Sequence, residues 1–576
     1  MSINRLSVAC EALAAKRAEV KRTRFEGEVP PALKEKYKGK AYFVKTYGCQ
    51  GNVRDGETMA GLLSLIGMHE AKDEKEASIA IINTCAVREN AEEKIYGEIG
   101  LYKENYQKDK DFALVIAGCA MAIDGLGEEI MERYPWVKLV ISTHEVGDLL
   151  SLLAEAMKKR TINVRPLYSE IVEELPVRRL DENKAYVNIS FGCDKFCTYC
   201  IVPYARGRER SRKKEDILKE CEELVRAGYK EITLLGQNVN SYGLDLKDGY
   251  LFADLLRDVA KTGIPRLRFL TSYPSVFNKE MAEAMAECPN ICPALHFPVQ
   301  SGSTSCLRRM GRRYTREEYL ERLEEIRSIV PGLAVSTDII VGFPGETEEE
   351  FEDTLSLVGE AKYASAFTFI YSPRPGTPAA KMEQVPSDVS HERFLRLKDT
   401  VEHSTSEYAA TFVGKTVEVL VDGPSKKDSD ILSGYTVEGK LVNFPGPSYL
   451  KGCLVNVKIL ESKTFHLKGE LAEDPLGAKA RDVSYLLSLE EEAKLAKAKI
   501  ADPDSLAHLR EIDSQLKATQ KKLALAMGNE EAHRKAKEEY ELLLSAIESD
   551  PLAVNYRREH AYLADELATI RGILER

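Results

Sequence analysis

Short runs of β-branched and aliphatic residues alternate with charged, helix-forming stretches along much of the chain, and this alternation limits the possible folds more than any other feature. The first four runs are AYFVKTYGC, SIAIINTC, FALVIAGC and KLVIST. Buried strands that alternate with helices are typical of a parallel α/β sheet. The sequence therefore predicts a parallel α/β domain at residues 40–160, preceded by a helical or loose N-terminal extension at residues 1–39.

A second α/β block is expected after a polar linker at residues 161–180. Its six strand candidates are AYVNIS, EITLLG, RLRFLTS, ALHFPVQ, AVSTDIIVGF and SAFTFIYSP, with helical segments such as EDILKECEELVRAG between them. Six successive β/α units predict a partial (β/α)6 barrel at residues 181–409. In such barrels the functional groups lie on the loops that follow the strands, so we expect the chemistry at one rim.

The pattern changes again near residue 412. Short alternating strands broken by Gly and Pro predict a small β-barrel at residues 412–474. From residue 476 to residue 576 apolar residues recur at helical spacing, as in Leu506, Leu509, Ile512 and Leu516. This spacing predicts a helical C-terminal extension and says nothing about chemistry.

Three cysteines lie close together directly after the first strand of the predicted barrel. Cys193, Cys197 and Cys200, here called the loop cysteines, occupy the segment GCDKFCTYC. Three thiolates on one tight loop can hold three irons of a 4Fe-4S cluster, and the missing fourth ligand leaves one iron open for a substrate. A zinc site or free thiols are the alternative, but zinc would need a fourth Cys or His and the loop has none.

Three other cysteines are far apart in the sequence but occupy the same position in the pattern. Cys49, Cys85 and Cys119, here called the strand-end cysteines, each follow a predicted strand of the first domain. The carboxyl ends of parallel strands meet at one edge of a sheet, so we expect these thiols to converge and hold a second 4Fe-4S cluster. For any one of them alone, a buried cysteine acting as a small hydrophobe is the alternative.

The motifs together resemble the methylthiotransferase family of radical S-adenosylmethionine (SAM) enzymes, from about residue 40 to residue 472. The resemblance rests on TYGCQ, NTCAVRENAEEKIYGEI, GCDKFCTYCIVPYARGRERSR and LLGQNVNSYG, and the small β-barrel resembles a TRAM domain. Within the family, these motifs are most similar to the branch that acts on isopentenylated adenosine in tRNA. Gly51 and Gly56 stand where the family usually has Met and Ser, which affects the loop shape and leaves the ligand Cys49 intact.

The resemblance implies a radical SAM methylthiotransferase that converts N6-isopentenyladenosine at position 37 of tRNA to its 2-methylthio derivative. It implies two 4Fe-4S clusters, with SAM as both radical source and methyl donor, and two partners, the tRNA anticodon stem-loop and an electron donor whose identity is open. Three alternatives remain: a methylthiotransferase for a threonylcarbamoyl-type tRNA adenosine, one for a ribosomal protein, and a noncatalytic RNA-binding iron-sulfur protein. Two three-cysteine sets that each leave an iron open count against the last.

Further residues at the predicted rim are candidates for binding SAM or RNA. The resemblance assigns to SAM the motif aromatic Tyr199 and the STDIIVGFPGE segment with Asp338, Ile340 and Gly342, although an ordinary strand and turn is the alternative. Gln237, Ser272 and Gln300 also end strands and could equally be structural hydrogen-bonding residues. Two basic runs predict RNA phosphate contacts, with a solvated charged face as the alternative. Their arginines are Arg206, Arg208, Arg210, Arg212, Arg308, Arg309, Arg312 and Arg313.

Composition and hydropathy indicate how the chain meets nucleic acid and whether it contacts a membrane. The 576 residues carry a net charge of −11, so no overall basic field attracts nucleic acid and any phosphate contact must come from a local patch. No apolar run reaches the ~18 to 20 residues that a membrane-spanning helix needs, and the N-terminus lacks the apolar core of a signal peptide. We expect a cytoplasmic protein without membrane contact, and a monomer.

Overall fold

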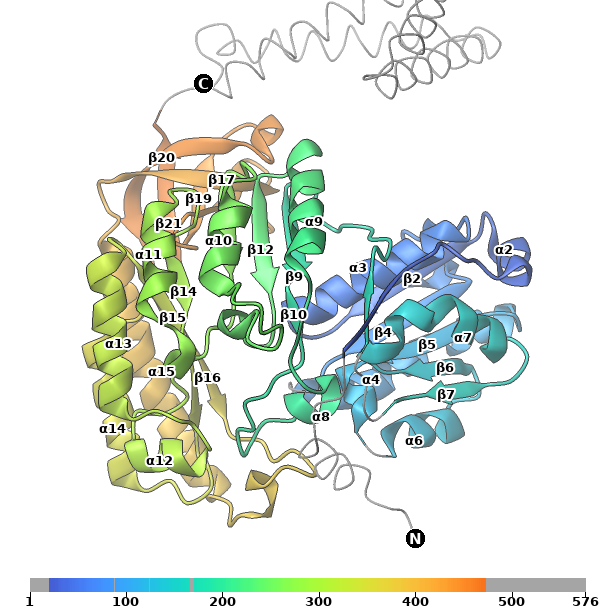
Figure 1. Cartoon of the computed structure of the whole chain (residues 1–576), viewed down its shortest axis with the longest axis horizontal. Helices are drawn as coiled ribbons and strands as arrows, with labels where there is room; N and C mark the ends of the chain where they lie inside the picture. Colours follow the sequence, from blue (N-terminus) through green and yellow to red (C-terminus); the bar gives the residue numbers. More distant parts are fainter. Residues whose placement is uncertain (1–19, 87–88, 124, 166–169, 473–576) are drawn as a thin grey trace, which may run out of the picture.

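The computed structural model describes residues 20–86, 89–123, 125–165 and 170–472, which form three bodies: an N-terminal sheet, a partial barrel and a small closed barrel (Figure 1). The helical extension expected at residues 476–576 lies outside the described residues. None of the helices within these ranges is long and apolar enough to cross a membrane.

The N-terminal body is a parallel sheet of six strands in the order β3-β2-β4-β5-β6-β7. The strands are β2 (Ala41–Thr46), β3 (His69–Glu70), β4 (Ile79–Thr84), β5 (Ala113–Gly118), β6 (Val137–Ile141) and β7 (Thr161–Asn163). Helices α2 (Pro31–Tyr37), α3 (Gln50–Leu65) and α7 (Leu149–Ala156) cover one face, and α4 (Glu89–Leu101), α5 (Lys103–Lys108) and α6 (Leu126–Arg133) cover the other. Because both faces are covered, β4 and β5 are buried at every position.

The N-terminal extension and the linker hold more regular structure than the sequence predicted. Strand β1 (Lys21–Arg24) pairs in parallel with β8 (Glu170–Glu173), and α2 buries Leu33 and Tyr37 against the sheet. The physical reason is complementary charge along this strand pair, because Lys21 and Arg24 form ion pairs with acidic residues of the linker. This strand pair joins the segment that precedes the N-terminal sheet in the chain to the segment that follows it.

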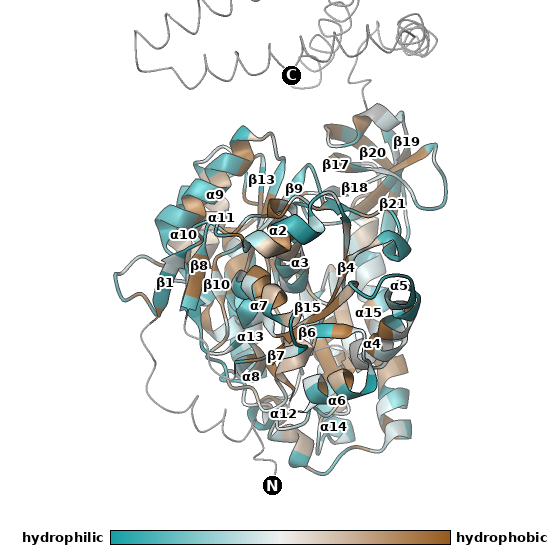
Figure 2. Cartoon of the chain, turned by 90° about the vertical axis from the view of Figure 1, so that its right-hand side faces the viewer, coloured by the Kyte–Doolittle hydropathy of each residue, from teal (hydrophilic) through white to brown (hydrophobic). Residues whose placement is uncertain are grey.

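The predicted partial barrel is confirmed. Its strands are β9 (Lys184–Asn188), β12 (Glu231–Leu235), β13 (Arg266–Phe269), β14 (Ala294–His296), β15 (Ala334–Val341) and β16 (Ser365–Ile370). Two parallel three-stranded sheets, β9-β12-β13 and β14-β15-β16, are joined by a bridge between Leu267 and Ile291. The outer layer consists of α9 (Lys214–Arg226), α10 (Phe252–Ala260), α11 (Lys279–Glu287), α13 (Arg316–Ile329), α14 (Glu348–Ala361) and α15 (Ser387–Ala410). Figure 2 shows the hydrophobic inner strands, including β4 of the first body, and the largely hydrophilic surface of α9.

The small closed barrel is docked at the end of the partial barrel where the strands begin. It contains β17 (Thr416–Pro424), β18 (Ile431–Thr436), β19 (Leu441–Pro445), β20 (Leu454–Ser462) and β21 (His466–Leu471), closed in the order β17-β18-β19-β21-β20. Arg266, the first residue of β13, is buried and donates hydrogen bonds to Glu418 and to the Tyr435 carbonyl. The loops after the barrel strands therefore open at the opposite end of the molecule, beside the N-terminal sheet (Figure 1).

Candidate active site

The loop cysteines lie on a loop that is tied to the barrel at several points. The loop leaves β10 (Ser190–Phe191) and returns through β11 (Arg210–Ser211), which pairs with β10 in antiparallel register. Gly192 has a φ of +76°, and a Cβ there would lie 2.2 Å from the Arg208 carbonyl oxygen, so only glycine fits this crossing. The Cys193 amide donates to the Gly207 carbonyl at 3.1 Å, and the Thr198 amide donates to the Met310 carbonyl at 2.9 Å.

The electrostatics of this loop resist thiolate formation without a bound cation. Burial and neighbouring thiolates raise the pKa of the Cys193 thiol well above its usual range and the pKa of Cys200 to about 12. A guanidinium offsets part of this cost, because Arg312 Nη1 lies 3.6 Å from Cys197 Sγ. Two buried thiols and one half-buried thiol, whose thiolate forms would repel one another, lie beside one arginine, and a positively charged iron cluster would satisfy this donor set.

The strand-end cysteines meet because β2, β4 and β5 are adjacent strands. Cys49 precedes the first residue of α3, Cys85 follows β4, and Cys119 opens the 3-10 turn Cys119–Ala122 after β5. All three surround Asn52: its Oδ1 lies 3.3 Å from Cys49 Sγ and 3.9 Å from Cys119 Sγ, and its amide donates to the carbonyl that precedes Cys85. The convergence inferred from the repeated strand-end position is thus present in the fold.

The strand-end thiols differ in protonation. A hydrogen bond with Cys85 and the nearby Arg206 guanidinium lower the pKa of Cys49 to about 5, despite an opposing contribution from burial. Burial raises the pKa of Cys119 to about 11, and Arg206 counteracts this rise. At neutral pH Cys49 is therefore ready to act as a thiolate ligand, whereas Cys119 would have to lose its proton when a metal binds.

A short helix separates the two groups of thiols. Helix α8 (Val202–Arg206) starts two residues after Cys200, and its Ala205 packs in one apolar cluster with Cys119. At its last residue, Arg206 Nε lies 3.0 Å from Cys119 Sγ and Nη2 lies 2.9 Å from Asp55 Oδ2. Helix α8 therefore connects the loop that carries one set of thiols to the edge of the N-terminal sheet that carries the other set.

The residues expected to bind SAM are mostly gathered at the barrel rim. Gln237 Oε1 accepts a hydrogen bond from the Gly192 amide, and Tyr199 packs edge-on against Phe343 with ring centroids 6.3 Å apart. Gln300 has a φ of +74°, and its backbone pairs with Asp338 and Ile340 of β15. A non-glycine residue held in the left-handed region at the end of a strand is a strained position of the kind found at ligand sites.

Gly342 lies at the turn after β15 and packs against α15. A Cβ on Gly342 would lie 2.3 Å from Ser390 Oγ of α15, and the residue borders a separate surface pocket with Tyr371 and His391. The SAM contact expected of Gly342 stays a prediction.

Three buried polar atoms at the rim have no hydrogen-bond partner within the described part of the chain. They are Ser190 Oγ, Asn238 Oδ1 and Ser272 Oγ, and each of these residues is at most 2% exposed. Buried polar atoms without a partner are costly, so their gathering at the ends of neighbouring strands indicates a polar ligand. Of the three, only Ser272 was expected from the sequence, although Ser190 and Asn238 also follow strand runs.

His296 is a further rim residue that sequence reasoning missed. Its Nε2 lies 3.4 Å from Asp338 Oδ2, its Nδ1 lies 3.0 Å from Ser336 Oγ, and its ring stands edge-on to Phe367. Phe367 and Phe369 are exposed on β16 at the open side of the barrel. The sequence signal for these residues is their alternating position along the strand segments ALHFPVQ and SAFTFIYSP, because every second residue of a barrel strand faces the interior.

The expected RNA contacts need correction at four arginines. Arg206, Arg210, Arg212 and Arg312 are each less than 10% exposed. Arg212 ion-pairs with Glu173 and Glu220, whereas Arg206 and Arg312 contact thiols. A one-dimensional charge run gave no indication of these buried partners, and burial leaves these four side chains unable to meet phosphate in the described fold.

The remaining arginines of the two runs are at least partly accessible. Arg208 is half-buried, ion-pairs with Asp194 at 2.9 Å and lies over the Phe196 ring. Arg309 pairs with Glu350. Arg308 and Arg313 are exposed. The accessible part of the basic patch is therefore small and lies on the side of the loop cysteines, next to Met310.

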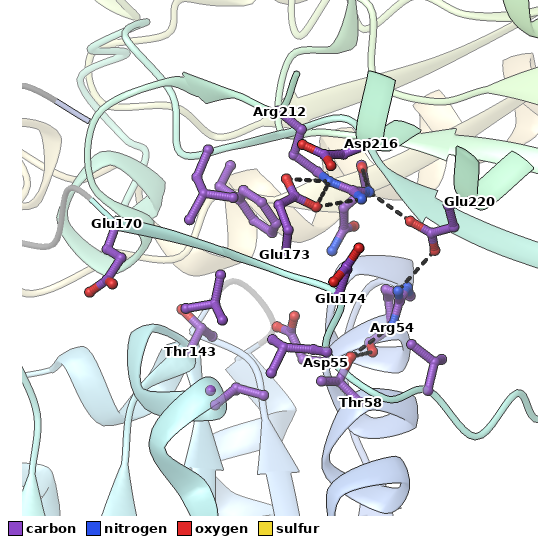
Figure 3. Close-up of a pocket in the computed structure, with 18 of the residues that line it drawn as sticks. Arg54, Asp55, Thr58, Thr143, Glu170, Glu173, Glu174, Arg212, Asp216 and Glu220 are labelled. Atoms are coloured by element: carbon purple, nitrogen blue, oxygen red, sulfur yellow. Dashed lines mark hydrogen bonds and ion pairs between the residues drawn. The ribbon is translucent and has the colours of Figure 1, made fainter. Parts of the chain in front are cut away.

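A cavity of about 550 Å³ separates the N-terminal sheet from the barrel and is crossed by charged pairs (Figure 3). Arg54 of α3 donates to Glu220 of α9 at 3.0 Å, and Arg212 binds the same carboxylate at 2.7 Å. Arg179 binds Glu220 as well. These contacts fix α3, which carries Asn52 and Asp55 toward the thiols, against the barrel.

The six thiols are not arranged as a site for a single ion. Across the described ranges, no group of three or more His, Cys, Asp or Glu side chains could hold a metal ion. A four-iron cluster has a different requirement, because each of its protein ligands binds a different iron atom.

Comparison with known proteins gives matches along most of the chain. Three family models match: the Radical SAM superfamily at residues 187–358, Uncharacterized protein family UPF0004 at residues 41–142, and the TRAM domain at residues 410–472.

Proteins named tRNA-2-methylthio-N(6)-dimethylallyladenosine synthase are similar to this chain over about three quarters of its length. The protein of Anoxybacillus flavithermus is 46% identical over 455 residues, covering 78% of this chain and 86% of that protein. The protein of Staphylococcus haemolyticus is 49% identical over 441 residues, covering 76% and 86%. The protein of Clostridium botulinum is 48% identical over 433 residues, covering 74% and 96%.

Solved structures are more distant. The radical S-adenosylmethionine methyltransferase TsrM of Kitasatospora setae, with cobalamin and a [4Fe-4S] cluster bound, is 15% identical with a TM-score of 0.45, covering 59% of this chain and 74% of that chain. A likeness of this degree carries no argument about function.

Proposed function

This chain belongs to the family of tRNA-2-methylthio-N(6)-dimethylallyladenosine synthases, and from this premise we propose that it converts N6-isopentenyladenosine at position 37 of tRNA to the 2-methylthio derivative. The observation that carries the proposal is the presence of two groups of three thiols on either side of α8. Replacing an unactivated aromatic C–H bond by C–S requires a radical source and a sulfur carrier, and two separate thiol groups can serve these two tasks.

The loop cysteines are the proposed ligands of the cluster that works with SAM. When bound, a 4Fe-4S cluster and SAM supply the one-electron chemistry that opens the C–H bond. Cys193, Cys197 and Cys200 would hold three irons and leave the fourth for SAM. The loop is anchored by Gly192 and Thr198, so these residues fix the position of the ligands relative to the barrel.

The rim residues would orient SAM. Ser190, Asn238 and Ser272 present buried oxygens that lack partners within the described residues, and a ligand with amino, carboxylate and hydroxyl groups could satisfy them. Tyr199, Gln237, Gln300, Asp338 and Ile340 frame the same end of the barrel. Their part in the proposal is to bind and position the ligand and to exclude water from the reacting atoms.

The strand-end cysteines are the proposed ligands of a second, auxiliary cluster. Cys49, Cys85 and Cys119 would again leave one iron without a protein ligand, where sulfur could be held and delivered. Asn52 contacts two of the thiols and bonds to the backbone beside the third, so it orients all three.

The RNA substrate would approach from the rim. The TRAM domain match and the names of the relatives support tRNA as the partner. The finer parts of the proposal are an anticodon stem-loop with its target base drawn into the barrel, a separate electron donor, and a monomer that works in the cytoplasm. Unpaired loop bases are the part of an RNA that proteins can extrude and stack on aromatic rings.

The experiment that tests this function combines metal analysis with nucleoside mass spectrometry. Protein reconstituted without oxygen should hold about eight irons, as two clusters of four. With SAM, a reductant, sulfide and tRNA that carries isopentenyladenosine, it should produce 2-methylthio-isopentenyladenosine. Activity only on tRNA with threonylcarbamoyladenosine, or only on a ribosomal protein, would assign a different substrate. Two clusters with no product from any of the three would contradict the enzyme assignment.

A further inference from the structure

Arg206 belongs to the barrel chain segment but its guanidinium lies among the residues of the N-terminal sheet. It is the last residue of α8, is 6% exposed, and donates its Nε–H to Cys119 Sγ at 3.0 Å. Its Nη2 lies 2.9 Å from Asp55 Oδ2, and the Cys49 thiol is near enough to be influenced by its charge. Arg206 thus brings a positive charge from the barrel segment into contact with the auxiliary site.

A buried arginine needs compensating negative charge. The partners of Arg206 are one carboxylate, Asp55, and the thiols Cys119 and Cys49, which all favour its protonated form. One carboxylate balances one guanidinium, so any further negative charge placed on the thiol group lies directly beside a fixed cation and an N–H donor. Hydrogen bonds to cluster sulfurs and the local net charge are the two levers by which a protein sets the potential of an iron-sulfur cluster.

The loop cysteines have an arginine of their own. Arg312 is 8% exposed, and its Nη1 lies 3.6 Å from Cys197 Sγ. Its other partners are neutral: the Tyr314 hydroxyl and the Pro298 carbonyl accept its remaining hydrogen bonds. The described contacts therefore give each thiol group one buried guanidinium. The guanidinium at the strand-end cysteines binds a carboxylate, whereas the other partners of the guanidinium at the loop cysteines are neutral.

We propose that Arg206 sets the reduction potential of the auxiliary cluster from across the domain boundary, by donating to the ligand Cys119, and that Asp55 opposes it. The proposal rests on the proposed function, because it takes the strand-end cysteines as cluster ligands. Reduction adds one electron, taken from the reductant, and no proton, so the reduced cluster is more negative than the oxidised one. A buried cation and an N–H···S bond stabilise the more negative state, which raises the potential.

The test is a redox titration of reconstituted protein with dithionite, followed by the electron paramagnetic resonance signals of the two clusters. In R206Q the auxiliary potential should fall, and a tenfold loss in the equilibrium constant for this one-electron step would appear as a shift of about 59 mV. The loop cluster should keep its potential. In D55N the auxiliary potential should move the opposite way, because a negative charge has been removed.

Two further variants separate charge from structure. In R312Q the loop-cluster potential should fall while the auxiliary potential stays in place, the reverse of R206Q. R266Q is the matched control, because Arg266 is equally buried and also binds a carboxylate, Glu418, but lies at the end of the barrel where the strands begin, away from both groups of thiols. R266Q should move neither potential, and R206K, which keeps the charge, should shift the auxiliary potential less than R206Q.

Two kinds of failure can be told apart. If the parent protein binds only one cluster, the proposed function is wrong and the inference falls with it. If both clusters form and R206Q leaves the auxiliary potential unchanged, or if R206Q and D55N shift it in the same direction, the function stands and the role of Arg206 is refuted. If R206Q fails to bind the second cluster, D55N and R206K still show in which direction the auxiliary potential shifts.

Discussion

The loop cysteines and the strand-end cysteines present the same number of thiols by opposite means. Cys193 and Cys200 are neighbours in the chain, and their placement depends on the local turn at Gly192 and on backbone hydrogen bonds to the barrel. Cys49 and Cys119 are far apart in the sequence and are brought together by the sheet, because neighbouring parallel strands end at one edge. The first arrangement is encoded by short-range sequence, and the second exists only when the whole domain has folded.

The two groups also differ in their electrostatics. Burial raises the pKa of Cys193 and Cys200, whereas Cys85 and Arg206 lower the pKa of Cys49 to about 5. Cys49 is also the exposed member of its group. Two of the loop cysteines, Cys193 and Cys197, are buried, and burial suits a site where a reactive species must be shielded from water. A more accessible edge with a ready thiolate suits a site that must receive sulfur repeatedly.

The largest expected effect comes from removing one ligand from each group. Cys197→Ala should abolish both reductive SAM cleavage and product formation, because the loop cluster binds SAM. Cys49→Ala should abolish product formation but retain SAM cleavage, because only the auxiliary cluster is lost. The measurement is chromatography of 5′-deoxyadenosine together with nucleoside mass spectrometry. Loss of cleavage in both variants would show that the two groups do not divide the reaction.

An intermediate effect is expected from glycines that precede each group. Gly192→Ala would place a Cβ 2.2 Å from a backbone carbonyl, and Gly48→Ala would place one 2.7 Å from Cys85 Cβ. Each should lower bound iron from about eight to about four per chain, with the other cluster retained. Gly228→Ala is the control: its φ is +88° but nothing lies within 4 Å, so strain of about 1–3 kcal/mol should leave the iron content unchanged.

The smallest expected effect is on tRNA binding by the exposed arginines near the loop cysteines. Arg308→Ala and Arg313→Ala should each weaken tRNA binding and lower the slope of log K against log salt by about 0.7 to 0.9, if each meets one phosphate. Arg226→Ala, at the exposed end of α9, is the control and should change nothing. Binding isotherms at several salt concentrations provide the measurement. Equal slopes in all variants would show that Arg308 and Arg313 do not contact phosphate.

Much of the fold and part of the site were accessible from sequence patterns. Strand runs such as EITLLG and AVSTDIIVGF correspond to β12 and β15, because buried parallel strands are nearly continuous apolar runs. Convergence of Cys49, Cys85 and Cys119 followed from their shared place after strands. The pairing of β1 with β8 did not, because a four-residue polar strand carries no periodic signal of its own.

The arginines show where sequence reasoning stops. In one dimension Arg206, Arg212 and Arg312 belong to exposed-looking basic runs, and an RNA contact was a reasonable prediction. Whether a charged side chain faces water or a buried partner depends on residues far away in the chain, such as Asp55, Glu220 and Cys197.

The sequence alone determined which thiols could act as ligands and which strands they follow, because spacing and strand periodicity are local properties of the chain. Only the tertiary structure decided that α8 joins the two thiol groups and that Arg206 crosses from the barrel to Cys119. Contacts of this kind are made between segments that become neighbours only after the sheet and the barrel have packed against each other, so no local pattern encodes them.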